Sequence, residues 1–244
     1  MRNLLLLVSL CLAPAPALAD PPAETLQRLQ EALELLAPHG PARSATVRIR
    51  TVISKPDGSD PEEQLRLVSV SISDDGTVDH TTVKVLQDGV DVTDDEEAQQ
   101  TFGKPSDEEA ESIESAEGED DGGAFSISMS LPVGDDRADY TFGDTRSEGG
   151  VQVASFEPVD GKSRKERTKL SVGVLAWDPV SLDPVWVEFG PDRNPRFISS
   201  MDSRLTFTRR GAWIYPDASV VDGVGGFLLY KRRMVFEMAV SDVK

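Results

Sequence analysis

The chain has 244 residues, of which 39% are hydrophobic, and a formal net charge of −18 at pH 7. This length allows one large β domain or two small domains. Because nucleic-acid binding needs clustered Lys and Arg, so acidic a chain is not expected to bind nucleic acid. Repulsion from anionic lipid headgroups also limits any expected membrane contact to a peripheral one.

The first 19 residues have the pattern of a signal peptide. Arg2 supplies the positive charge, and the apolar run from 4 to 12 is too short to span a bilayer as a permanent helix. Ala17-Leu18-Ala19 is a small-x-small cleavage pattern, so we expect cleavage near Ala19 and a periplasmic or secreted mature chain.

Residues 21–37 are predicted to form a helix. Leucines recur at helical spacing, and Pro38, Gly40 and Pro41 end the pattern. These leucines are Leu26, Leu29, Leu33 and Leu36. An isolated helix of this length is marginal in water, so the stripe must pack on another element, for which a sheet face is the obvious partner. The alternative is a mobile lid over a cavity.

An antiparallel meander is predicted next, with strands at 43–54, 65–73 and 77–86. Apolar residues alternate with polar ones, and Pro56-Asp57-Gly58 and Asp74-Asp75-Gly76 are turn signals. In the third strand, Val83 and Val85 are expected on one face.

Residues 88–121 contain fifteen acidic residues and one lysine. So dense a charge block cannot bury enough surface to offset the entropy of ordering it. We interpret residues 93–122 as an acidic, largely disordered insertion in a single domain covering 20–244. Its alternative roles are a weak divalent-cation binder or a tail that keeps basic partners close; the spacing does not fit an EF-hand loop.

Strands are then expected at 124–131, 138–146 and 150–158, followed by a basic run from Lys162 to Lys169. The run is interpreted as an exposed hairpin tip or a charged edge that discourages edge pairing. The alternative is a contact for the acidic insertion or for an acidic partner.

The stretch from 168 to 192 predicts the hairpin around which the other strands are arranged. Because side chains alternate between the two faces of a strand, one set of residues shares a face of the first strand and another set shares a face of the second. The first set is Leu170, Val172, Val174 and Ala176, and the second is Val185, Val187 and Phe189.

The C-terminal third is predicted to contain three more strands. Residues 204–210 place Leu205 and Phe207 inward, and 212–221 form the next strand. Residues 225–240 are expected to form one unusually long strand. A strand of that length is typical of a curved sheet or an open barrel that bends at glycines.

The segments GVLAWDPVSLDPVWVEF (173–189) and GGFLLYKRRMVFEMAVSDV (225–243) resemble exported bacterial proteins similar to the lipoprotein-localisation carriers, the LolA/LolB-like superfamily. The shared features are the two Asp-Pro pairs before the strand at 185–189 and the aromatic and basic closing strand. The resemblance implies a mainly β fold: a curved antiparallel sheet or half-open β-barrel of about eleven strands, with the N-terminal helix on its concave face. It also implies an apolar concavity that holds acyl chains.

No catalytic motif and no cluster of metal-ligating residues is found in the sequence. His39 and His80 are far apart, and Cys11, the single cysteine, lies in the signal segment. We therefore expect no enzyme activity, no cofactor and no metal site.

The expected function is that of an exported binding or carrier protein for a hydrophobic or lipid ligand, such as a lipoprotein acyl chain. Large apolar side chains on the strands are the candidate pocket lining. The candidates are Trp186, Phe207, Tyr230 and Phe236. The alternative is a non-enzymatic envelope scaffold that contacts a partner protein through its acidic insertion and its basic segment at 162–169.

Overall fold

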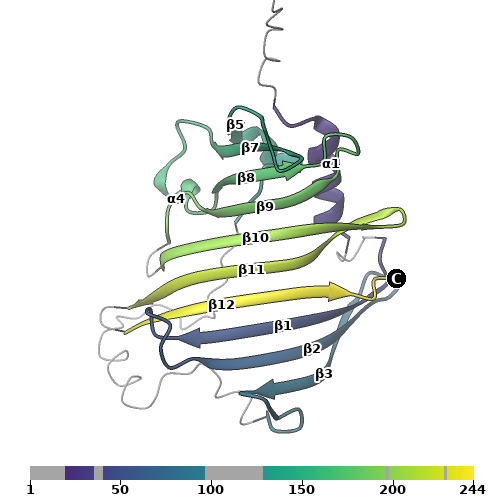
Figure 1. The fold of residues 1–244 in the computed structure, drawn as a ribbon, viewed down its shortest axis with the longest axis vertical. Helices are drawn as coiled ribbons and strands as arrows, with labels where there is room; N and C mark the ends of the chain where they lie inside the picture. The colour runs from purple at the N-terminus through teal and green to yellow at the C-terminus, as the bar shows by residue number, and fades with distance from the viewer. Residues whose placement is uncertain (1–19, 36–40, 97–128, 196–197, 228–229) are drawn as a thin grey trace, which may run out of the picture.

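The computed structural model describes residues 20–35, 41–96, 129–195, 198–227 and 230–244. In this part of the chain, twelve antiparallel strands form one curved sheet that does not close on itself, and an N-terminal helix packs against it (Figure 1). The mainly β fold with an N-terminal helix, predicted from the alternation of apolar residues, is confirmed. The acidic insertion lies largely outside the described residues.

The order of strands brings the first long strand and the last one together in the middle of the sheet. From one edge to the other it runs β4 (Val90–Asp91), β3 (Val78–Gln87), β2 (Glu62–Ile72), β1 (Ser44–Ser54), β12 (Tyr230–Ser241), β11 (Trp213–Phe227), β10 (Ile198–Arg210), β9 (Pro184–Pro191), β8 (Ser171–Trp177), β7 (Val151–Pro158) and β5 (Tyr140–Phe142), with β6 (Arg146–Glu148) paired to β7. The helices are α1 (Ala23–Leu33), the short α4 (Arg164–Arg167) and the 3-10 helix η1 (Gly134–Asp139). The hairpin of β8 and β9 has strands on both sides, as predicted.

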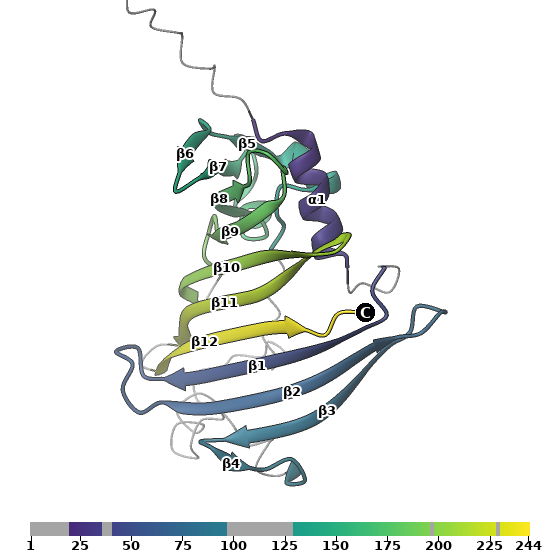
Figure 2. The same cartoon turned by 45° about the vertical axis from the view of Figure 1, so that its right-hand side comes forward.

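Helix α1 crosses one face of the sheet and contacts β9, β11 and η1 (Figure 2). Leu29 is completely buried, and Leu26 and Leu33 pack against the same cluster. Burial of one such side chain contributes about 1.5–3 kcal/mol, which explains why the leucine stripe docks on the sheet. The helix begins at Ala23, two residues later than predicted, and Leu36 and Ala37 lie outside the described residues.

We call the face that carries α1 the inner face and the opposite one the outer face. Side chains alternate between the faces along a strand, and directly paired residues on neighbouring strands share a face. The first core cluster lies between α1 and the inner face of β7 to β10. Its buried members are Leu29, Ala32, Leu131, Tyr140, Ala154, Phe156, Leu170, Leu175, Trp177, Val187 and Phe207.

A second core cluster lies beyond the C-terminal end of α1. It joins β1 and β2 to β11 and β12. Its buried members are Leu35, Ala42, Ala45, Val47, Val70, Tyr215 and Val240. Tyr215 belongs to this cluster, whereas its neighbour Ile214 packs against the first. The register of β10 and β11 shifts next to Pro216, where a β-bulge bends the long strand.

The single strand predicted for residues 225–240 is wrong. β11 ends at Phe227 and β12 begins at Tyr230, and these two residues pair antiparallel, so the chain reverses between them. Neither Leu228 nor Leu229 is a residue type typical of hairpin turns, and the apolar sequence continues through them. The pattern of apolar residues therefore gave no sign of this hairpin. The described chain has twelve strands instead of about eleven.

Three local predictions also need correction. Val83 is 53% exposed and Val85 fully buried, because a register shift in the pairing of β2 with β3 interrupts the alternation. Of the strand expected at 138–146, the first two residues belong to η1 and the strand is only Tyr140–Phe142. Of the strand expected at 124–131 only the end is described, and there Ser130 makes an isolated bridge with Leu170.

The hairpin at 168–192 buries Leu170 and Val187 as expected, but the other core residues of its first strand come from the opposite set. In β8 the core residues on the inner face are Leu175 and Trp177, whereas Val172, Val174 and Ala176 point to the outer face. Both faces of this strand are apolar, so alternation alone could not identify the one on which α1 packs.

Candidate functional site

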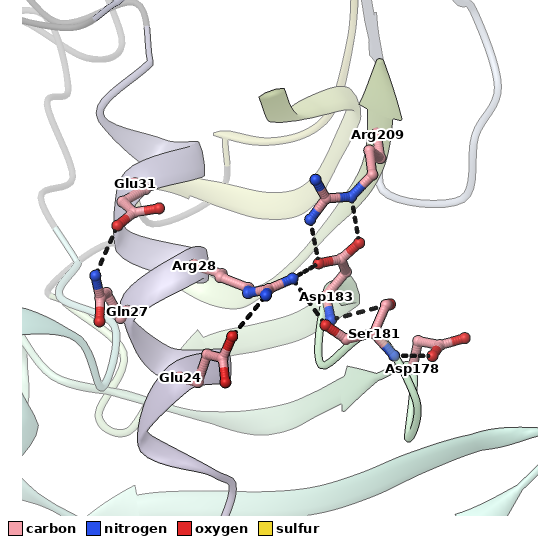
Figure 3. Close-up of polar contacts among 8 residues, drawn as sticks. All are labelled: Glu24, Gln27, Arg28, Glu31, Asp178, Ser181, Asp183 and Arg209. Atoms are coloured by element: carbon pink, nitrogen blue, oxygen red, sulfur yellow. Dashed lines mark hydrogen bonds and ion pairs between the residues drawn. The ribbon is translucent and has the colours of Figure 1, made fainter. Parts of the chain in front are cut away.

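An ionic cluster fixes α1 over the sheet, and we call it the latch. Asp183, in the turn before β9, accepts hydrogen bonds from Arg28 of α1 and from Arg209 of β10 (Figure 3). Arg209 binds in a bidentate manner, with both nitrogen–oxygen distances 2.6 Å. Arg28 also donates to the Ser181 carbonyl at 2.7 Å and to Glu24 at 2.6 Å. The latch therefore joins the helix, the β8–β9 turn and the end of β10.

The Asp183 carboxylate is well suited to this role because its side chain is only 13% exposed. Its hydrogen bond with Arg209, and then that with Arg28, lowers the pKa of Asp183 below its ordinary value, and burial opposes them. The same contacts raise the pKa of Arg28 and of Arg209. All three groups are therefore charged at neutral pH, and α1 is held over β9 to β11.

A cavity of about 700 Å³ opens between the C-terminal half of α1 and the hairpin of β10 and β11. Its lining is Arg28, Glu31, Ala32, Glu34, Leu35, Pro41, Arg209, Ala212, Trp213 and Ile214. Four of these ten residues are charged, and two of the four belong to the latch. This cavity is therefore a poor match for a purely apolar chain.

A more apolar surface lies on the inner face beyond α1, on three long neighbouring strands. We call it the inner apolar strip: Val221 of β11, Met234, Phe236 and Met238 of β12, and Ile49 and Ile53 of β1. The register places them on one face, because Ile49 pairs with Met238, Ile53 with Met234, and Phe236 with Val221. All six side chains stay partly exposed, and Met234 is 49% exposed.

The outer face of the same strands carries charged cross-strand pairs among apolar residues such as Val52, Val220 and Val235. Arg50 of β1 binds Glu63 of β2 and Glu237 of β12, which lowers the pKa of Glu63. Arg233 of β12 likewise binds Asp222 of β11 and lowers the pKa of that carboxyl. These strands therefore have a face with ion pairs and a face with a strip of partly exposed apolar groups.

The three candidate lining residues whose side chains are described do not come together. Phe207 is 9% exposed and packs in the first core cluster. Trp186 pairs with Thr206 and lies on the outer face, where the Arg204 guanidinium stands 5.0 Å from its ring centre. Phe236 lies in the inner apolar strip. Tyr230 pairs with Phe227 through its backbone, and its side chain is outside the described part.

Sequence reasoning missed the methionines and isoleucines of the strip. Met234 and Met238 share the parity of Phe236, so the sequence of β12 alone indicates that these three side chains lie on one face. The contribution of Ile49 and Ile53 depends on the pairing of the first strand with the last, which no local pattern reveals.

Within the described ranges, no group of three or more His, Cys, Asp or Glu side chains could hold a metal ion. A helix with the length and apolar character needed to cross a membrane is not found in those ranges either.

No protein-family model and no curated protein sequence matches the chain. Among solved structures, it is similar to an outer membrane lipoprotein-sorting protein domain from Vibrio parahaemolyticus, at 11% identity over 91% of each chain with a TM-score of 0.35. It is also similar to a DUF1329 family protein from Desulfovibrio piger, at 9% identity over 93% of each chain with a TM-score of 0.37. A third similar structure is that of the Pseudomonas aeruginosa MucA/MucB complex, at 9% identity over 90% of this chain and 94% of the other, with a TM-score of 0.23.

The resemblance to lipoprotein-sorting proteins is thus found among solved structures as well as in the sequence. The three TM-scores are all below 0.5.

Proposed function

We propose that this chain is an exported, periplasmic binding or carrier protein that holds a hydrophobic or lipid ligand on the inner face of its sheet, beside α1. The ligand is bound and released without covalent chemistry. The signal-peptide pattern of residues 1–19 supports export, with cleavage near Ala19.

The observation that carries this proposal is the inner apolar strip. Six apolar side chains on three adjacent strands are partly exposed on the face opposite the ion pairs, which is also the face on which the latch fixes α1. Contiguous exposed apolar surface is typical of binding sites, because water around it is released when a ligand covers it. Methionines suit a site that accepts flexible chains, since their side chains adapt in shape.

The strip can be tested by placing a charge on it. Met234→Asp introduces a carboxylate at an exposed position, where it should be tolerated in the folded protein but would have to be desolvated beneath an apolar ligand. We expect the mature chain, residues 20–244, to bind the neutral methyl ester of a pyrene-labelled fatty acid. Met234→Asp should weaken this binding at least tenfold in a fluorescence titration.

Val220→Asp is the matched control. Val220 lies on neighbouring β11, is 40% exposed, and pairs with Arg204 and Glu237 on the outer face. This variant should bind the ester as the wild type does. Equal losses in both variants, or a wild-type chain that binds neither the ester nor the corresponding free acid, would refute the proposal.

A second candidate function is contact with an acidic partner through the basic segment 162–169. In the structure this segment includes α4, capped by Ser163, instead of a hairpin tip. Lys162 pairs with Asp139 and Arg167 with Asp192. The exposed cations of the segment are Arg164, Lys165 and Lys169.

The second candidate is tested by a pull-down with the triple variant Arg164→Gln, Lys165→Gln and Lys169→Gln, at low and at high salt. Charge-mediated contact is screened over a Debye length of about 8 Å at physiological ionic strength. Envelope partners that depend on this surface should be lost from the variant and at high salt. Partners unchanged in every condition would exclude this role.

A further inference from the structure

The inner face carries polar groups at one end of the apolar strip. Arg66 of β2 pairs with Ile49, and Gln64 of β2 pairs with Thr51, so both side chains share the face of the strip. The Nε atom of Arg66 donates a hydrogen bond to Oε1 of Gln64 at 2.5 Å, which confirms that the two side chains lie together.

Arg66 differs in its partners from three arginines of the outer face. Arg50, Arg204 and Arg233 each bind at least one carboxylate. Half-buried Arg66 binds only the uncharged amide of Gln64 among the described residues. Its remaining N–H groups and its positive charge are therefore available to an anion.

Gln64 adds a second unused donor. The side chain is buried, with 4% of the residue exposed, and its Oε1 atom is occupied by Arg66. Its Nε2 atom is buried and has no hydrogen-bond partner. Buried donors are normally paired, and a donor without a partner is destabilising until an acceptor arrives. Across the strand pair, Oε1 of Gln87 is also buried without a partner.

We propose that Arg66 and Gln64 bind the anionic headgroup of an amphiphile, a carboxylate or a phosphate ester, whose apolar chain lies along the inner apolar strip. This inference rests on the proposed function and names its class of ligand. Val221, at the far side of the strip, is three strands from β2, a distance of about 14 Å at the usual strand spacing. An acyl chain in the strip thus has room to extend away from a headgroup at β2.

An uncharged hydrocarbon would fit this surface less well. It would cover Arg66 and the Gln64 amide without offering them an acceptor, and a buried charge without a partner is costly. An anionic oxygen accepts from the guanidinium and from Nε2 together, and charge-assisted hydrogen bonds of this kind are the strong ones.

The test compares the pyrene-labelled fatty acid with its methyl ester at neutral pH and low salt. The two probes share one chain and differ in the charge of the headgroup. Wild-type protein should bind the acid at least about tenfold more tightly than the ester, as expected for hydrogen bonds to a charged group. Arg66→Gln should abolish this preference by weakening binding of the acid, whereas the ester, which no longer covers an unpartnered charge, should bind at least as tightly as it does to the wild type.

Arg48→Gln is the matched control, since it removes an arginine from the outer face of adjacent β1. Arg48 is exposed and pairs with Ala239 and Leu67. The change in net charge is the same in both variants, so a general electrostatic effect would appear in both. The control should keep the wild-type preference for the acid.

The outcomes separate the two proposals. Binding of the ester without preference for the acid, or an equal loss of preference in both arginine variants, overturns the headgroup site and leaves the carrier function standing. A wild-type chain that binds neither probe overturns both. Acetate or inorganic phosphate at millimolar concentration should not displace the acid. Displacement by either would show a site for a free anion and refute the amphiphile.

Discussion

Gly173 is placed where no side chain fits. A Cβ atom there would stand 2.1 Å from the Glu188 carbonyl oxygen, 2.7 Å from the ring of Phe156 and 2.9 Å from Cβ of Phe189. The two aromatic side chains lie over β8 on the inner face, so the glycine lets the first core cluster close beneath α1.

Gly173→Ala should therefore destabilise the fold by about 1–3 kcal/mol or more, because the backbone of β9 must move to admit the methyl group. Urea unfolding would measure this loss. Gly223→Ala in β11 is the control: its nearest contact would be 3.4 Å, an ordinary van der Waals distance, and the expected change is within about 0.5 kcal/mol. Similar losses in both variants would show that Gly173 is not specially constrained.

At the scale of elements, the position of α1 depends on apolar packing together with the latch. Leu29 and Ala32 supply the packing, and Asp183 joins the helix to β10 through two arginines. A single carboxylate with two cationic partners is a more specific constraint than the leucine stripe, which could slide along an apolar sheet face.

Asp183→Asn should cost about 2–3 kcal/mol, since it leaves two arginines facing an uncharged amide in a partly buried site. Glu188→Gln is the control, because it removes the partner of Arg204 in a pair whose side chains are 46–47% exposed, and such pairs contribute less than about 1 kcal/mol. Urea unfolding of both variants checks this order. Equal stabilities for the two variants would contradict a structural role for the latch.

The latch also predicts how stability depends on pH. The folded-state pKa of Asp183 is lower than its ordinary value of 3.8, so its contribution is complete above about pH 4 and is lost as the pH falls through the folded-state pKa. The wild-type chain should lose more unfolding free energy between pH 6 and pH 3 than Asp183→Asn does. Carboxyls such as Glu63 and Asp222 titrate in both proteins and cancel in the comparison. An identical loss in both would show that Asp183 is not the group responsible.

Elements defined by local periodicity could be predicted from the sequence. The helix, the meander of β1 to β3 and the β8–β9 hairpin follow from the spacing of apolar residues. The reversal between Phe227 and Tyr230 could not, because apolar residues continue through it. The face occupied by Trp186 was also not predictable, since β9 carries apolar side chains on both faces and only the position of α1 distinguishes them. Arg66 was missed because its position beside Ile49, on the face of the strip, depends on strand register.

For the whole molecule, the sheet is larger than its helix can cover. α1 lies over the part that includes β9 and β11, and the inner face continues across β12, β1 and β2 with apolar groups and then Arg66 and Gln64. The surface thus changes from apolar to cationic across neighbouring strands, an arrangement that matches an amphiphile. We propose that this surface binds a lipid-like ligand in the native compartment.

The most direct measurement is the chemical identification of what the protein carries. The chain would be exported to a bacterial periplasm through residues 1–19, purified without detergent, extracted with organic solvent and analysed by mass spectrometry. We expect about one acyl-chain amphiphile per protein from the wild type and from Val220→Asp, and little from Met234→Asp. Wild-type protein free of lipid, or equal lipid in Met234→Asp, would contradict the proposal.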